Sequence, residues 1–278
     1  MRLPAKMNIP GWHWVAHAAA PSIWGHLPGK ATPVAFDTFA GEAQAWQHWW
    51  IHQTQPATRQ ASTSLQRRRK PSRPTSPQWF HLEPQTRTRE RAWEPVAFVL
   101  PPGSLSMVTE HFLIGAVICW ADEQGLPRPL IIYQPSNRRW LEQHLQPSGC
   151  PASSLVQAWL YTLCTLLSCY QPQAKPPRRP LPNAVRHLWQ LFAPGWAQWL
   201  GDPRPTPSLA AMQQALGECT GLGDAAPELQ RAMHSVTLPW GDWPQCLWSK
   251  PPRAGFWQHD LQGACLATGT GLNDLWPY

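Results

Sequence analysis

The first strong hydrophobic pattern in the chain is helical. In the stretch GEAQAWQHWWIHQ, residues 41–53, apolar side chains recur near every third or fourth position, at Ala43, Trp46, Trp50 and Ile51. This spacing places them on one face of a helix. Residues 1–36 carry Pro or Gly every few positions, and we expect irregular chain there.

The segment 94–150 contains the clearest alternation of predicted elements. Two apolar runs, EPVAFVLPPG and PLIIYQP, predict strands. Ser104 is placed to cap a helix through LSMVTEHFLIGAVICWADEQ, which Gly125 would end, and Asn137 is placed to cap a helix over RRWLEQHL. This order predicts a βαβ unit with parallel strands. The β-branched residues of FLIGAVICW, 112–120, suit a strand equally well, and the unit would then be antiparallel.

The pattern from Ser153 onward is mostly helical. A proline–glycine pair at 194–195 should kink or split one of these helices, and residues 237–278 return to irregular chain rich in Trp, Pro and Gly. The predicted helices are 154–170, 183–200 capped by Asn183, 207–217 capped by Thr206 with Pro207 first, and 225–235 capped by Asp224.

These patterns together predict an α/β or α+β fold. It has a small central sheet from 94–134, a predominantly helical C-terminal half and long irregular Pro/Trp-rich segments. The expected division is an irregular and helical N-terminal segment at 1–53, a basic flexible arm at 54–92, an α/β unit at 93–150 and a helical C-terminal region at 151–278.

Charge changes the picture because its excess lies in one segment. The whole chain has 23 Lys and Arg, 16 Asp and Glu, and a net charge of +7. Nine of those cations and two of those acids lie in 54–92, so that segment alone accounts for the +7 and the rest of the chain balances. The segment has almost no aliphatic residues, so it cannot bury enough surface to offset its ordering entropy.

An arginine-rich flexible arm indicates a polyanionic partner. Arginine binds phosphate in bidentate fashion and stacks on bases, and such binding is driven largely by counterion release. We therefore interpret the protein as a non-catalytic nucleic-acid-binding subunit, for RNA or DNA, in a multiprotein or ribonucleoprotein assembly with other protein subunits. A plain linker, or a targeting or membrane-surface signal, is the alternative for the arm. The expected contact residues are Arg67, Arg68, Arg69, Lys70, Arg73, Trp79, Arg87, Arg89, Arg91, Arg138, Arg139, Lys175, Arg178 and Arg179.

Composition bears on partners and location. Charged residues are 14% of the chain, with 19 Trp and 33 Pro, which favours a subunit whose surface is partly covered; a GC-rich genome is the alternative source of this bias. Seven cysteines without a CxxC pair indicate a reducing, cytoplasmic location. The longest uncharged apolar stretch, 155–170, is too short for a membrane span, and no membrane contact is expected.

Two histidine pairs share the spacing HxxxH. His13 and His17 form one pair and His48 and His52 the other, and on a helix each pair would share a face suited to zinc. A metal-dependent enzyme using these four residues is the alternative function, and a protein-only scaffold is another. The sequence has no HExxH, no GxSxG and no P-loop, and we expect no other cofactor.

The stretch GACLATGTGL, residues 263–272, is rich in glycine. It resembles the glycine-rich loop of the RAMP-type RNA-binding proteins of CRISPR complexes, with Gly263, Gly269 and Gly271 in corresponding places. Cys265 stands where that loop has a further glycine. The resemblance covers ten residues and implies RNA contact through the backbone, as in a CRISPR effector subunit.

Overall fold

Three hydrophobic strands form the centre of the sheet. In the computed structural model these are β5 (Val96–Leu100), β6 (Phe112–Ala121) and β7 (Pro127–Ser136), and β6 pairs antiparallel with both neighbours. The structure describes residues 14–15, 18–30, 32–38, 40–54, 94–122, 124, 126–144, 154–171, 177–197, 208–221, 245–259, 265–269 and 271–276.

The helix expected after Ser104 is wrong. Ser104 instead donates its hydroxyl to the Pro101 carbonyl in a turn, and residues 112–121 form β6. The nine residues from Phe112 to Trp120 are all buried because both faces of this strand are covered. Such a strand loses the alternation of polar and apolar positions that distinguishes a strand from a buried helix in sequence. The antiparallel alternative is therefore the correct one, and the fold is mixed α+β.

The sheet is larger than the predicted 94–134 core. Its path runs β1-β2-β7-β6-β5-β8-β9, and β3 pairs with both β7 and β4, all antiparallel. The expectation of irregular chain over 1–36 is wrong for the four strands β1 to β4, which extend the sheet beyond β7. The prediction of irregular chain throughout 237–278 is also wrong, because β8 and β9 extend the sheet beyond β5. The remaining strands are β1 (Trp14–Val15), β2 (Ala18–Ala19), β3 (Ser22–Gly25), β4 (Val34–Phe36), β8 (Gly255–His259) and β9 (Cys265–Gly269).

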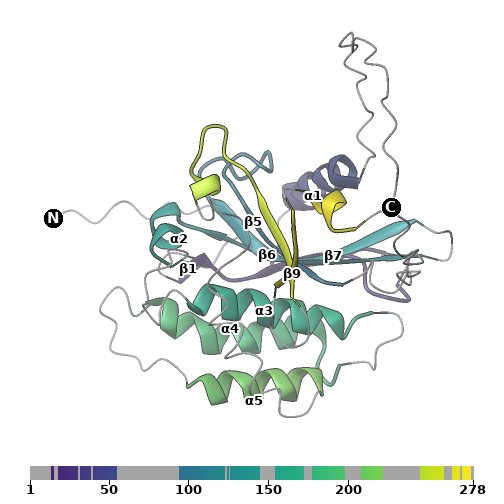
Figure 1. The fold of residues 1–278 in the computed structure, drawn as a ribbon. Coiled ribbons are helices and arrows are strands. Elements are labelled where there is room, and N and C mark those ends of the chain that lie inside the picture. Colours follow the sequence, from purple (N-terminus) through teal and green to yellow (C-terminus); the bar gives the residue numbers. More distant parts are fainter. Residues whose placement is uncertain are drawn as a thin grey trace, which may run out of the picture.

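Helices cover both faces of the sheet (Figure 1). Helix α1 (Ala40–Thr54) and the short 3-10 helix η5 (Leu272–Asp274) lie on one face. Helices α3 (Ser154–Ser168), α4 (Leu181–Ala197) and α5 (Leu209–Thr220) stack on the other. Two shorter elements are α2 (Arg138–His144) and the 3-10 helix η4 (Gln245–Leu247).

Most helix predictions hold, with shifted ends. The predictions for α1, α2 and α3 agree with the structure to within a few residues. Helix α4 runs through Pro194 as one element and ends three residues later, so the missing amide affects only its last turn. Helix α5 is capped by Ser208, whose Oγ accepts from the Ala211 amide, and ends at Gly221 with φ 73°. The predicted helix 225–235 lies outside the described residues.

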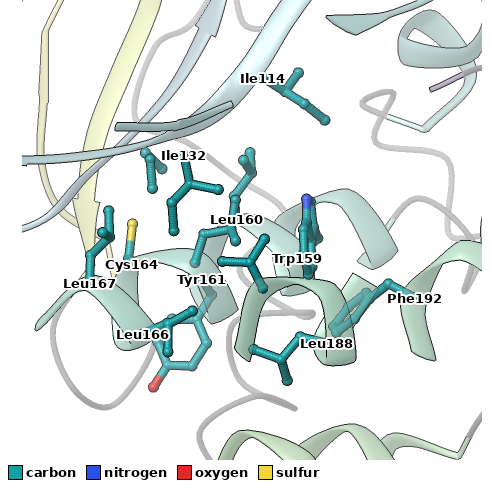
Figure 2. Packing of buried hydrophobic residues seen from close by; sticks show 14 of the residues in the cluster. Ile114, Ile132, Trp159, Leu160, Tyr161, Cys164, Leu166, Leu167, Leu188 and Phe192 are labelled. Atoms are coloured by element: carbon teal, nitrogen blue, oxygen red, sulfur yellow. The ribbon is translucent and has the colours of Figure 1, made fainter. Parts of the chain in front are cut away.

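Each face of the sheet carries its own hydrophobic core. Along β6, Ile114, Ala116 and Ile118 face α3–α5, and Leu113 and Val117 face α1. Figure 2 shows the first core, where Ile114 and Ile132 from the sheet lie over Trp159 and Leu160 of α3. This arrangement explains why α3 is apolar around most of its circumference: it lies between the sheet and α4.

Two further expectations concern membranes and cysteines. Within the described residues, no helix combines the length and the hydropathy that crossing a bilayer requires. Five cysteines, Cys119, Cys164, Cys169, Cys219 and Cys246, are free thiols and are buried. Burial raises the pKa of the Cys119, Cys164, Cys169 and Cys219 thiols, so these groups stay protonated at neutral pH.

Candidate functional site

The two ends of the predicted basic arm are held by one buried tryptophan. The Trp276 indole Nε1 donates to the Glu94 carbonyl at 3.0 Å, just before β5. The Trp276 ring also packs edge-on against Trp50, with centroids 6.2 Å apart, in the last turns of α1. Trp276 is only 2% exposed. Its contacts with Trp50 and Glu94 show that the residues flanking the arm on both sides lie in the same part of the fold.

The arm itself, from residue 55 to residue 93, lies outside the described residues. The predicted contacts Arg67, Arg68, Arg69, Lys70, Arg73, Trp79, Arg87, Arg89 and Arg91 therefore stay predictions. Lys175 and His13 and His17 also lie outside the described part.

Four of the predicted nucleic-acid contact residues lie in two separate parts of the described structure. Arg138 and Arg139 open α2, where the Arg138 guanidinium binds Glu142 at 2.8 Å and lies 5.5 Å from the Trp248 ring centroid. Arg178 and Arg179 precede α4, and Arg179 lies 3.6 Å from Glu218. These ion pairs are exposed, and exposed pairs are worth about 1 kcal/mol or less. A phosphate can therefore compete for both guanidinium groups.

Charge within the described part of the chain is nearly balanced. It contains nine Lys and Arg and eight Asp and Glu. Four of those carboxylates form ion pairs with described arginines: Asp122 with Arg128, Glu142 with Arg138, Glu218 with Arg179, and Asp37 with Arg186. The described surface accordingly offers few uncommitted carboxylates to the cations of the arm.

A hollow of about 330 Å³ opens beside α1, close to where the arm begins. Its walls come from α1, from the turn after β5 and from β8, and its polar lining is His48, His52, Gln53, Ser104 and Ser106. Apolar groups, among them Trp49 and Phe256, form its floor. A hollow of this size lies at the small end of the range for ligand sites in proteins, about 300 to 1,000 Å³.

The structure brings His48 and His52 together as the HxxxH spacing predicts. Their Nε2 atoms lie 3.0 Å apart and their ring centroids 4.3 Å apart, with the rings inclined at 71°. Both side chains are exposed, and at this distance one ring donates to the other. Among the described residues, no group of three or more His, Cys, Asp or Glu is arranged to hold a metal ion. Of the four histidines of the predicted site, only His48 and His52 lie within the described residues.

A buried polar pair that the sequence did not reveal lies on the same face of the sheet. The Tyr133 hydroxyl donates to Glu42 Oε2 at 2.6 Å, and both residues are fully buried. Burial and the Glu42 carboxylate raise the pKa of Tyr133, so its hydroxyl keeps its proton. Glu42 precedes Trp46 by four residues on the face of α1 that packs on the sheet. This four-residue spacing was the one feature of the sequence that could have placed Glu42 on the buried face of α1.

Other groups with perturbed pKa values lie apart from the hollow. Burial and the nearby Arg128 guanidinium lower the pKa of His26, and burial lowers the pKa of His111. The pKa of Asp122 is lowered mainly by the hydrogen bond from the Leu126 amide, with Arg128 adding to it. Asp122 closes the turn between β6 and β7, which is a structural role.

Most described tryptophans serve packing. Nine are buried, including all three of the WQHWW stretch. Those indoles belong to the core between α1 and the sheet, so packing is their role in this structure. In the glycine-rich stretch 263–272, residues Cys265–Gly269 form strand β9, which pairs with β8, so this part is not an open loop.

Comparisons with known proteins identify no relative. No family model matches the chain, and no curated protein matches it. Among solved structures, the chain is similar to the crystal structure of PA0076 from Pseudomonas aeruginosa, at 12% identity and a TM-score of 0.34, over 85% of this chain and 81% of that one. At this level the similarity assigns neither a family nor a function.

Proposed function

We propose that the protein is a non-catalytic nucleic-acid-binding subunit of a larger assembly, which holds the phosphate backbone with the arginine-rich arm at 54–92. The observation that carries the proposal is the location of charge. The arm holds nine cations against two acids, equal to the whole net charge of +7. Eight of the nine cations are arginine, the side chain that pairs best with phosphate oxygens.

The ion pairs of the described part support this reading. If the arm neutralised the protein's own surface, uncompensated carboxylates would be expected there. Instead four of the eight described carboxylates, Asp37, Asp122, Glu142 and Glu218, each face a described arginine, and Glu42 is buried with Tyr133. An external polyanion is therefore the better partner for the arm.

The anchoring of both ends supports a looped binding element. Because Trp276 ties Glu94 to the end of α1, the arm leaves and returns at one place. A loop of 39 residues doubled back on itself can reach at most about 65 to 70 Å from its base. Because nine cations belong to one segment, a first phosphate contact favours further contacts on the same strand.

The described surface favours nucleic acid over a purely protein-binding scaffold. Its exposed large apolar residues are Phe36, Ile51 and Leu126, which lie on β4, on α1 and in the β6–β7 turn. A protein interface usually has a contiguous apolar centre, and these three residues lie on separate elements. Contacts with other subunits of the assembly are part of the proposal, but the arm is assigned to nucleic acid.

Salt dependence of binding tests the proposal. Anisotropy of labelled 20-nucleotide RNA, single-stranded DNA and duplex DNA is titrated with full-length protein from 50 to 400 mM NaCl. The test variant replaces residues 67–70 with glutamine. Losing four phosphate contacts should flatten the slope of log K against log salt by about 2.8 for single strands and about 3.6 for duplex.

Two control variants separate charge from other effects. Replacing Arg67, Arg68 and Arg69 with lysine keeps the charge and should keep the slope. Replacing Arg178 and Arg179 with glutamine removes cations outside the arm and should change the slope by less than the arm variant does. If the 67–70 variant binds with unchanged affinity and slope, the arm is not the binding element. If the intact protein binds no nucleic acid at 50 mM NaCl but retains protein partners on purification, the scaffold is the correct function.

A further inference from the structure

We propose that His48 and His52 form a chelating site for one divalent transition-metal ion, with copper(II) and zinc(II) as the ions that fit best. The two side chains lie one turn apart on α1, and both line the hollow. This site is separate from the arm, and the proposal does not depend on nucleic-acid binding.

The separation of the two nitrogens matches a shared metal ion. With metal–nitrogen bonds of about 2.0 to 2.1 Å, two ligands at a tetrahedral angle stand about 3.3 Å apart, and two at a right angle about 2.9 Å. The observed Nε2···Nε2 distance of 3.0 Å lies between these values. Small side-chain rotations would therefore be enough to place both lone pairs on one ion.

The chemistry of the lining selects the class of metal. Magnesium and calcium need several carboxylate or carbonyl oxygens, and no Asp or Glu lines the hollow. Two imidazoles instead suit copper, nickel and zinc, with copper(II) strongest among the divalent ions. Cys119, Cys164, Cys169, Cys219 and Cys246 are buried, and none of them lines the hollow.

Binding would replace the hydrogen bond between the two rings. In the pair as it stands, one Nε2 carries a proton and the other accepts it. To bind the ion, the donor ring takes the tautomer with its proton on Nδ1, which frees the second Nε2 lone pair without net loss of a proton. Gln53, Ser104 and Ser106 also line the hollow, and their side-chain oxygen atoms or water could supply further ligands.

Metal titration of the full-length protein tests the site. Copper(II) and zinc(II) chlorides are titrated by calorimetry at pH 7.5 into the wild type and into His48→Gln and His52→Gln. Glutamine keeps the helix but is a poor ligand for these ions. Each variant should lose at least about tenfold in the affinity of one site per chain, because a single imidazole lacks the chelate's second, intramolecular ligand.

His187→Gln is the matched control, since His187 lies on α4 away from the hollow. It should leave the affinity unchanged. The copper(II) electron paramagnetic resonance spectrum provides a second readout, and it should show two coordinated nitrogens in the wild type and fewer in each variant. The proposal is overturned if the wild type binds neither copper(II) nor zinc(II) with a dissociation constant below about 100 µM. It is also overturned if either His48→Gln or His52→Gln retains the wild-type affinity.

Discussion

Replacing Tyr133 with phenylalanine tests the buried hydrogen bond between β7 and α1. The substitution removes one oxygen atom and keeps the ring, which packs 4.8 Å from the Trp46 ring centroid. Glu42 would then lose a donor 2.6 Å away in a site where neither side chain is exposed. The change therefore isolates the hydrogen bond from the packing of the aromatic ring.

The expected cost follows from burial and from the short distance. A hydrogen bond to a charged group contributes about 1.5 to 3 kcal/mol, and a buried carboxylate that loses such a donor costs stability of that size. We expect Tyr133→Phe to lower the free energy of unfolding by about 2 kcal/mol. In a chain of this size that corresponds to roughly 4 to 8 °C in Tm.

A double-mutant cycle with Glu42→Leu distinguishes the hydrogen bond from other effects. Glu42→Leu should also destabilise, because it leaves the Tyr133 hydroxyl buried without its acceptor. Removing both partners leaves neither group unsatisfied, so the double variant should cost at least about 1.5 kcal/mol less than the sum of the single variants. Urea unfolding followed by far-UV circular dichroism measures all four proteins, with an unchanged m-value as the check on two-state behaviour.

Additivity of the two single substitutions to within about 0.5 kcal/mol would refute this reasoning. It would mean that Tyr133 and Glu42 each contribute independently, and that the 2.6 Å contact does not couple α1 to the sheet.

Three further predictions concern the scaffold. Gly115→Ala should destabilise the fold by more than about 2 kcal/mol in urea unfolding, because the added Cβ would lie 2.1 Å from the Ile132 backbone oxygen in β7. Gly41→Ala is the control: a Cβ at this position of α1 meets no atom within 4 Å, so the change should be neutral or stabilise by up to about 1 kcal/mol. Asp122→Asn should lower Tm more at pH 6 than at pH 2.5. The depressed pKa of Asp122 contributes stability that is present above the unfolded value of 3.8 and decreases as pH falls toward the folded pKa, so a pH-independent difference would contradict this. Ser208→Ala should cost about 1 kcal/mol and Ser208→Asp should not, measured by thermal unfolding.

Local sequence was sufficient for elements whose pattern is carried by their own residues. Helix α1 follows from the spacing of its tryptophans, and α2 from Asn137, whose Oδ1 accepts from the Arg139 amide as the cap prediction requires. Strands β5 and β7 follow from short apolar runs bounded by proline and glycine. In each case the sequence names both the residues that are buried and the residues that end the element.

Strands β6, β8 and β9 needed the tertiary structure. For β6 the reason is burial on both faces, which leaves no periodicity to read. For β8 it is distance along the chain, since Ala97 pairs with Trp257 and no local signal marks that partner. Strands of five residues in a Trp- and Gly-rich segment cannot be distinguished from irregular chain in the sequence until neighbouring strands supply their hydrogen bonds.

The candidate sites divide in the same way. The sequence alone determined that the net charge lies in 54–92 and that His48 and His52 share a helical face, because charge and helical spacing are properties of consecutive residues. Only the tertiary structure decided that Trp276 joins the two ends of the arm, that the histidines open onto a hollow, and that Glu42 meets Tyr133 across 91 residues. Such contacts depend on which distant segments the core brings together, and no local pattern encodes them.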